Sequence, residues 1–207
     1  MLKIKVCGMR QLPNIKALEA LKPDIMGFIF FPGSKRYVGA DFRVPDLKNI
    51  QKAGVFVDEQ TENIKEIVIK NKLDLVQLHG NESPKLCCEL ASAGIKIIKA
   101  ISIGNSVDWP SIEAYLPYCQ YLLFDTKSEN HGGSGRKFNW DLLQSYPFST
   151  PYFIGGGIGI DDIQAINEHS NHHFAGVDIN SSFELEPGLK DIESIKHFIK
   201  TLRNETI

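Results

Sequence analysis

The sequence predicts an α/β fold, a single-domain (β/α)8 TIM barrel that spans residues 1–207. Short runs of aliphatic and β-branched residues recur along the chain, and segments with helical periodicity lie between them. Several of the runs are apolar almost throughout, as is typical of parallel strands that are covered on both faces. A doubly wound open sheet is the main alternative, because alternating strands and helices predict a parallel sheet in either case.

The expected strands share this apolar character and are bounded by turn-forming or charged residues. There are eight of them, which is the number that a closed (β/α)8 barrel needs. They lie at Lys3–Val6, Ile25–Phe30, Ala53–Val57, Leu73–Leu78, Lys96–Ala100, Tyr121–Phe124, Tyr152–Ile154 and Ala175–Ile179.

Four helices have recognisable starts. One covers residues 61–70, with Thr61 as its candidate N-cap, and another begins at Ser83, where Pro84 occupies the favoured first helical position. Asp161 or Asp162 begins a third, and the last covers residues 191–200.

Composition indicates a globular protein, since 43% of the residues are hydrophobic and 23% are charged. The formal charge is −2 and no long basic run is present, so we expect no nucleic-acid partner. The sequence contains neither a signal peptide nor an apolar stretch long enough to span a bilayer, which predicts a cytoplasmic protein with no membrane partner. We expect a monomer or a homodimer. The four cysteines lack the spacing of a zinc site and are expected to be free thiols.

Cys7 and Asp125 are the candidate catalytic residues. Each follows an apolar run directly, at the point where a parallel strand would lead into a loop. In a (β/α)8 barrel the carboxyl ends of the strands meet around one mouth, where active sites lie. A thiol and a carboxyl group on opposite sides of a bound sugar can act as a base and an acid.

Three consecutive glycines, Gly155, Gly156 and Gly157, follow the seventh expected strand. They could form a tight turn, but such a run also lets backbone N–H groups approach an anion closely, and we favour phosphate binding. The segment fits neither a dinucleotide fingerprint, since Ile160 replaces the last glycine, nor a P-loop. Ser181 and Ser182 follow the next strand and would lie beside the glycines, as in other barrel phosphate sites.

Two further side chains are candidates for substrate binding. Arg36 follows the second strand, and its planar guanidinium suits a carboxylate, although a lone loop arginine is usually just solvated. His79 ends the fourth strand and could equally hydrogen-bond a neighbouring loop. The glycine-rich loop at residues 127–137 directly follows Asp125, and it is either an active-site lid or a surface loop.

In this order along the chain, these motifs resemble the phosphoribosylanthranilate isomerase family. The resemblance covers nearly the whole chain, and the ordered set is far more specific than any one motif. It rests on Lys5–Met9, Gly27–Phe30, Ser34–Val38, Gly54–Val57, Val76–Gly80, Phe124–Lys127, Gly132–Gly135, Phe138–Trp140, Gly155–Ile158 and Gly176–Ser181.

The resemblance implies an Amadori rearrangement of the phosphorylated aminosugar N-(5-phosphoribosyl)anthranilate in tryptophan biosynthesis, with no metal and no organic cofactor. It implies that Asp125 is the general acid that opens the furanose ring and that Cys7 is the general base that takes the C2 proton. Arg36 would hold the anthranilate carboxylate. Substrate contacts are also expected from His79 and Asp178, and phosphate contacts from Gly156, Gly157, Ser181 and Ser182.

Three other functions compete with this one. The aminoaldose isomerase of histidine synthesis is a related barrel, but that family typically uses two aspartates, and here the first strand ends in Cys7. A non-catalytic phosphosugar-binding barrel is the second alternative, and the presence of both Cys7 and Asp125 argues against it. A thiol-redox protein built on Cys7 is the weakest alternative, because no resolving cysteine is close in sequence.

Overall fold

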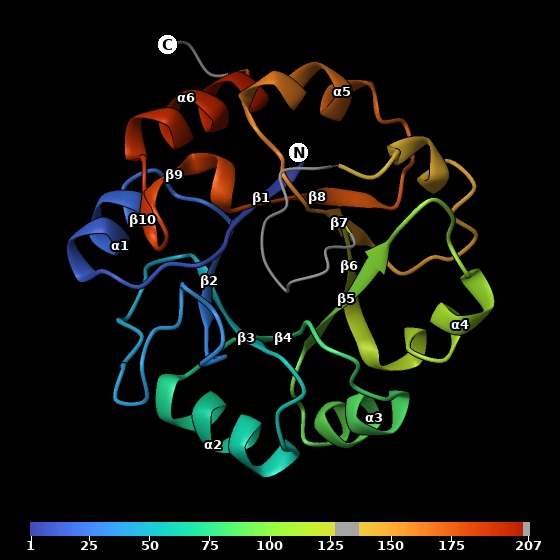
Figure 1. Cartoon of the computed structure of the whole chain (residues 1–207), viewed down its shortest axis with the longest axis horizontal. Helices are drawn as coiled ribbons and strands as arrows, with labels where there is room; N and C mark the ends of the chain where they lie inside the picture. The colour runs from blue at the N-terminus through green and yellow to red at the C-terminus, as the bar shows by residue number, and fades with distance from the viewer. Residues whose placement is uncertain (127–136, 205–207) are drawn as a thin grey trace.

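The computed structural model describes residues 1–126 and 137–204 and contains a closed barrel of eight parallel strands (Figure 1). β1 pairs with both β2 and β8, so the sheet has no free edge. The predicted (β/α)8 barrel is therefore confirmed and the open sheet is excluded. The strands are β1 (Lys3–Val6), β2 (Ile25–Ile29), β3 (Gln51–Phe56), β4 (Leu75–Leu78), β5 (Ile97–Ile103), β6 (Cys119–Thr126), β7 (Tyr152–Ile154) and β8 (Phe174–Ile179).

The helices form a ring outside the strands (Figure 1). They are α1 (Leu12–Glu19), α2 (Thr61–Asn71), α3 (Pro84–Ser92), α4 (Trp109–Glu113), α5 (Ile163–Glu168) and α6 (Ile192–Leu202). Short 3₁₀ turns lie at Leu116–Tyr118 (η1), Trp140–Leu143 (η2), Ile160–Asp162 (η3) and Ser181–Phe183 (η4), and a small hairpin joins β9 (Glu184–Glu186) to β10 (Leu189–Lys190). Residues 30–50, between β2 and β3, contain no helix, although regular alternation would place one there.

The helix starts follow local capping chemistry. Ser83 precedes Pro84 and is the N-cap of α3, as the sequence predicts, and it accepts a hydrogen bond from the Leu86 N–H. Asp191, which was expected to be the first residue of the last helix, is the N-cap of α6 and accepts from the Ser194 N–H. The prediction that Thr61 caps α2 is wrong. Gln60 is the N-cap, while Thr61 lies within the first turn and its hydroxyl bonds Glu89.

Two apolar layers hold the barrel together. The inner layer consists of Ile25, Ala53, Leu75, Ile98, Ala100, Tyr121, Leu123 and Phe153, all of them buried. The outer layer lies between the strands and the helices and contains most of the remaining buried aliphatic and aromatic residues.

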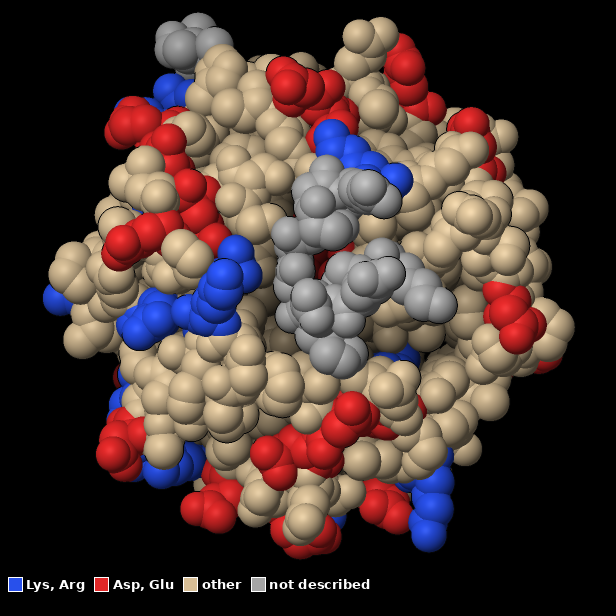
Figure 2. Space-filling model, viewed as in Figure 1, with Lys and Arg blue, Asp and Glu red and all other residues tan. Residues whose placement is uncertain are grey.

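Among the described residues, no helix has the length and apolar character needed to cross a membrane. Acidic and basic side chains are interspersed over the face seen in Figure 2.

A buried ion pair secures the loop after β4. Lys99 on β5 contacts the Glu82 carboxylate at 2.8 Å, and the two side chains are 4% and 1% exposed. Lys99 also donates to the Leu78 and Gly80 carbonyls, and Glu82 accepts from the N–H groups of Asp58 and Gly80. The loop that carries His79 is therefore fixed by a fully bonded charge pair.

We expect Glu82→Ala to lower the free energy of unfolding by about 3 kcal/mol or more, because it leaves the Lys99 ammonium buried without its counter-ion. Urea unfolding measures the change. Glu62→Ala on α2 is the matched control, since Glu62 is 82% exposed and lies 3.9 Å from Lys65, and it should cost no more than about 0.5 kcal/mol. Equal effects of the two substitutions would contradict a stabilising role for the pair.

Candidate active site

Cys7 and Asp125 lie at the same end of the barrel. Cys7 directly follows β1 and is 4% exposed, and its N–H donates to the Ile179 carbonyl of β8. Asp125 lies near the end of β6, with a side chain that is 24% exposed. β7 and β8 separate the two strands, so the thiol and the carboxyl group approach the mouth from different sides.

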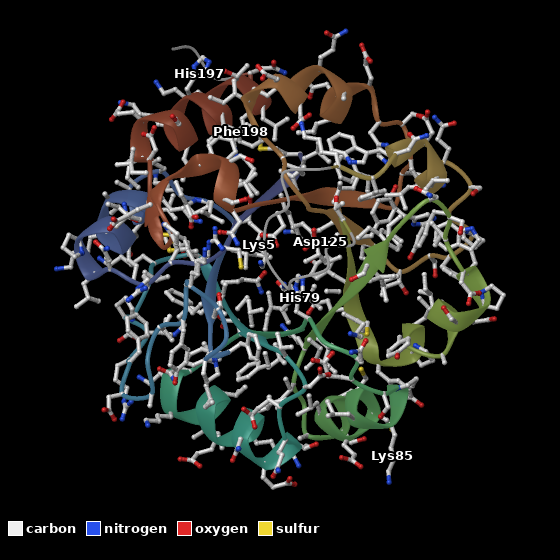
Figure 3. The ribbon with its side chains drawn as sticks, in the orientation of Figure 1. Lys5, His79, Lys85, Asp125, His197 and Phe198 are labelled. Atoms are coloured by element: carbon white, nitrogen blue, oxygen red, sulfur yellow. The ribbon has the colours of Figure 1, made fainter. Side chains whose placement is uncertain are left out.

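Asp125 is held by two donors. The Thr126 N–H bonds its Oδ1 at 2.7 Å, and His79 Nε2 faces its Oδ2 at 3.2 Å. The other ring nitrogen of His79 lies 2.7 Å from Gln77 Nε2. With the Gln77 amide as donor, Nδ1 is the acceptor and the ring proton lies on Nε2, where it points at Asp125. Figure 3 shows His79 and Asp125 side by side near the barrel axis.

Cys7 lies in a buried and charged environment. Burial raises the pKa of its thiol above the ordinary value, while Lys5 and Lys190 oppose the rise. Lys5 is fully buried, and its Nζ donates to both oxygens of Asp178 at 2.9 Å. Asp178 was expected to contact substrate, and the structure adds a second role as the partner of Lys5.

Arg36 lies at the mouth of the barrel and forms an ion pair with Glu184. Its Nε and Nη2 form a bidentate contact with Glu184, with Nη2 at 2.6 Å from Oε2. Glu184 also accepts from Lys190 Nζ and from the Gly188 N–H. None of the Arg36 bonds to described residues uses Nη1, so one edge of the guanidinium faces away from Glu184.

The glycine loop and the serine turn lie close together. Gly156 and Gly157 have φ angles of +82° and +77°, in the left-handed region that glycine adopts without strain. A Cβ on Gly159 would lie 3.8 Å from Ser182 Cβ, so the loops after β7 and β8 are neighbours, as expected. A short 3₁₀ turn, rather than an α-helix, follows the glycines, and Asp162 already bonds the Gly159 N–H at 2.7 Å.

The structure adds side chains that the sequence did not single out. They are Lys5, Gln77, Glu184 and Lys190, and all but Glu184 are polar residues in fully buried positions.

The expected lid at residues 127–137 lies outside the described residues except for Lys137, which pairs with Asp162. In the described part of the chain, no cluster of three or more His, Cys, Asp or Glu side chains could hold a metal ion.

A closed (β/α)8 barrel with a thiol, a carboxyl group and a glycine loop at the carboxyl ends of its strands defines a barrel enzyme of the acid–base type. Residues 4–201 match the family model described as N-(5'phosphoribosyl)anthranilate (PRA) isomerase. The N-(5'-phosphoribosyl)anthranilate isomerase of Parabacteroides distasonis is 41% identical over 99% of this chain and 95% of its own length.

Solved structures agree with the sequence matches. Phosphoribosyl anthranilate isomerase from Thermotoga maritima has a TM-score of 0.82 at 32% identity and covers 99% of this chain and 100% of its own. Another phosphoribosyl anthranilate isomerase, solved with reduced 1-(o-carboxyphenylamino)-1-deoxyribulose 5-phosphate, has a TM-score of 0.78 at 29% identity, with the same two coverages. The chain belongs to the phosphoribosylanthranilate isomerase family and is an isomerase of tryptophan biosynthesis.

The Glu184 contacts predict an acid-side loss of stability. Burial by itself would raise the pKa of Glu184, but Arg36 and Lys190 hold it below the ordinary value of 4.5. The contacts of ionised Glu184 with Arg36 and Lys190 therefore stabilise the fold fully when the pH is above the ordinary pKa of 4.5. This contribution to stability disappears as the pH falls through the lower pKa of Glu184 in the folded state. Glu184→Gln should remove this contribution.

Urea unfolding of the wild type and Glu184→Gln, from about pH 6 down to about pH 3, measures the difference in the free energy of unfolding. We expect the difference to shrink toward the acid end. Glu186→Gln, an exposed position on the same strand, is the control and should give a small, constant difference. If the difference in the free energy of unfolding between the wild type and Glu184→Gln does not vary with pH, ionised Glu184 does not provide this stabilisation.

Proposed function

We propose that Cys7 is the general base and Asp125 the general acid of the isomerisation. One observation carries this proposal: the two groups approach the barrel mouth from β1 and β6, so a sugar between them would meet a base on one side and an acid on the other. Asp125 would donate a proton to the furanose ring oxygen as the ring opens to a Schiff base. The Cys7 thiolate would then take the C2 proton, and the resulting enolamine would tautomerise to the ketone.

His79 supports Asp125 in this scheme. Its Nε2 faces the carboxyl group at 3.2 Å, and the contact with Gln77 fixes the orientation of the ring. The carboxyl group is therefore aimed at the mouth by groups from β4 and by its own neighbour Thr126. The direct substrate contact expected of His79 stays a prediction.

Arg36 would bind the anthranilate carboxylate through the guanidinium edge that Glu184 leaves open. Glu184 occupies Nε and one side of Nη2, and this contact holds the planar group in one orientation. A prearranged guanidinium loses little side-chain entropy when the carboxylate arrives. The benzoate ring of the substrate would therefore be oriented by Arg36, while the phosphate anchors the other end.

The phosphate would bind backbone N–H groups of the glycine loop and of the Ser181–Ser182 turn. The left-handed conformation of Gly156 and Gly157 supports this, because successive backbone N–H groups can then converge on one anion. The Gly159 N–H is already taken by Asp162, and the N–H groups of Gly156 and Gly157 are the proposed phosphate donors. The substrate contact expected of Asp178 stays a prediction, since both of its oxygens accept from Lys5.

The wider organisation of the protein follows from the same proposal. A single domain over residues 1–207 would carry the complete site, because the carboxylate, acid–base and phosphate groups come from both halves of the chain. A cytoplasmic location and a monomeric or homodimeric state stay predictions.

Cys7→Ala and Asp125→Asn should each lower kcat by about 10²–10⁴-fold, because each removes one proton-transfer group while leaving the binding groups in place. Single-turnover measurement of anthranilate fluorescence reports the chemical step directly. A variant that keeps more than about a tenth of wild-type turnover would show that its residue has another role.

Arg36→Lys should raise KM more than it lowers kcat, because lysine keeps the charge but loses the planar fork. A substrate analogue without the anthranilate carboxylate is the control. The wild type and the variant should bind that analogue about equally. If the variant loses as much affinity for the analogue as for the true substrate, Arg36 does not bind the carboxylate.

The phosphate site is tested by an isosteric pair, Gly157→Asp and Gly157→Asn. Both side chains tolerate the left-handed backbone better than most residues, so the two variants share any strain and differ in one charge. We expect inorganic phosphate to compete with substrate in the wild type, less in the Asn variant and least in the Asp variant. Equal inhibition of the two variants would place the phosphate elsewhere.

A further inference from the structure

We propose that Lys5 is a positioning residue that keeps its ammonium group beside the Cys7 sulfur and stabilises the thiolate. This inference rests on the proposed role of Cys7 as the base. It addresses a difficulty that the fold creates, because a thiol that is 4% exposed is disfavoured as an anion unless a cation lies near it.

The backbone brings the two side chains together. Lys5 and Cys7 are two residues apart along an extended segment, so both project to the same face, toward the barrel interior. Gly27 on the adjacent strand makes room for them. A Cβ at Gly27 would lie 2.8 Å from Cys7 Sγ and 3.2 Å from Lys5 Nζ, so the sulfur and the ammonium group border the same small space. Figure 3 shows Lys5 near the axis of the barrel.

Asp178 keeps Lys5 charged and in place. Both carboxylate oxygens accept from Nζ at 2.9 Å, and the lysine side chain is 1% exposed. Burial by itself would lower the pKa of Lys5, but Asp178 and Cys7 raise it above its ordinary value. The ammonium group therefore stays protonated while it faces the sulfur.

The other charged groups near Cys7 are already engaged. Lys190 on β10 also favours the thiolate, but its Nζ bonds Glu184 and Asn180. Arg36 is paired with Glu184, and His79 faces Asp125 on the far side of the mouth. Asp178 disfavours the thiolate by its charge. Lys5 is also bonded, to Asp178, but its Nζ borders the same space beside Gly27 as the Cys7 sulfur, and this position distinguishes it from the other cations.

A purely structural role is the alternative. In that case Lys5 would only neutralise Asp178, and the thiol would not respond to it once Asp178 is neutral. The comparison of Asp178→Asn with Lys5→Met/Asp178→Asn separates the two roles, because both variants lack the carboxylate and differ only at Lys5.

The experiment uses the full chain with Cys87→Ala, Cys88→Ser and Cys119→Ser, which leaves Cys7 as the one thiol. The second-order rate of alkylation by iodoacetamide is measured against pH, and the midpoint of the curve reports the thiol pKa. Relative to Asp178→Asn, the double variant should have a midpoint about one pH unit higher and react about tenfold more slowly near neutral pH. Lys3→Met, on the same strand, should leave the midpoint of the parent chain unchanged.

Coincident midpoints for Asp178→Asn and the double variant would overturn the proposal. If Lys5→Met/Asp178→Asn does not fold, Lys5→Gln/Asp178→Asn makes the same comparison with a side chain that can still donate a hydrogen bond. The proposed role of Cys7 is tested separately by the turnover of Cys7→Ala. A normal turnover there combined with a shifted alkylation midpoint would reject the base while keeping the Lys5–Cys7 interaction.

Discussion

The ion pair between Lys5 and Asp178 lies at the seam where the barrel closes. These two residues are register partners on β1 and β8, the first and last strands of the barrel, and the chain must bring them together across most of its length. The pair is buried, so it is stable only when both partners are present and fully bonded. Because Cys7 follows β1 directly and donates its N–H to β8, the position of the thiol depends on this seam.

A second charged network connects the loops above the strands. Glu184 binds Arg36 from the loop after β2 and Lys190 from β10, and Lys190 in turn binds Asn180 at the end of β8. The Arg36–Glu184 contact joins residues 148 positions apart, whereas Lys190 bonds residues only six and ten positions away. In both networks a buried carboxylate holds a cation, and in the proposed scheme the charge of that cation also favours an anion, the Cys7 thiolate for Lys5 and the substrate carboxylate for Arg36.

The sequence was sufficient for the barrel but not for these networks. Strand positions could be predicted because a parallel strand covered on both faces is apolar, and the predictions for β5 and β6 stopped short where polar residues such as Ser102 and Asp125 continue the strand. Cys7, Asp125 and the glycine loop were recognisable by their places at strand ends. The pairing of Arg36 with Glu184 spans 148 positions and leaves no local pattern.

Lys5 and Gln77, by contrast, could have been recognised from the sequence as buried polar residues. Each is a polar residue inside a run that was expected to be covered on both faces, and a buried polar side chain needs a partner. A lysine within the first strand thus implies a carboxylate on a neighbouring strand, and Asp178 was available in the last one.

The proposed site would have to bind an anionic substrate and also hold Cys7 as a thiolate. Phosphate and carboxylate attract cations to the mouth, whereas the thiolate requires one inside the barrel. In the proposed site these two demands are met at different depths. The N–H groups of the glycine loop and the guanidinium edge of Arg36 that Glu184 does not contact would bind the substrate anions at the mouth, whereas Lys5 is buried, at 0% exposure. In the proposed scheme, a cation that is buried below the mouth and bonded to Asp178 would keep its charge beside the Cys7 sulfur when the substrate anions bind.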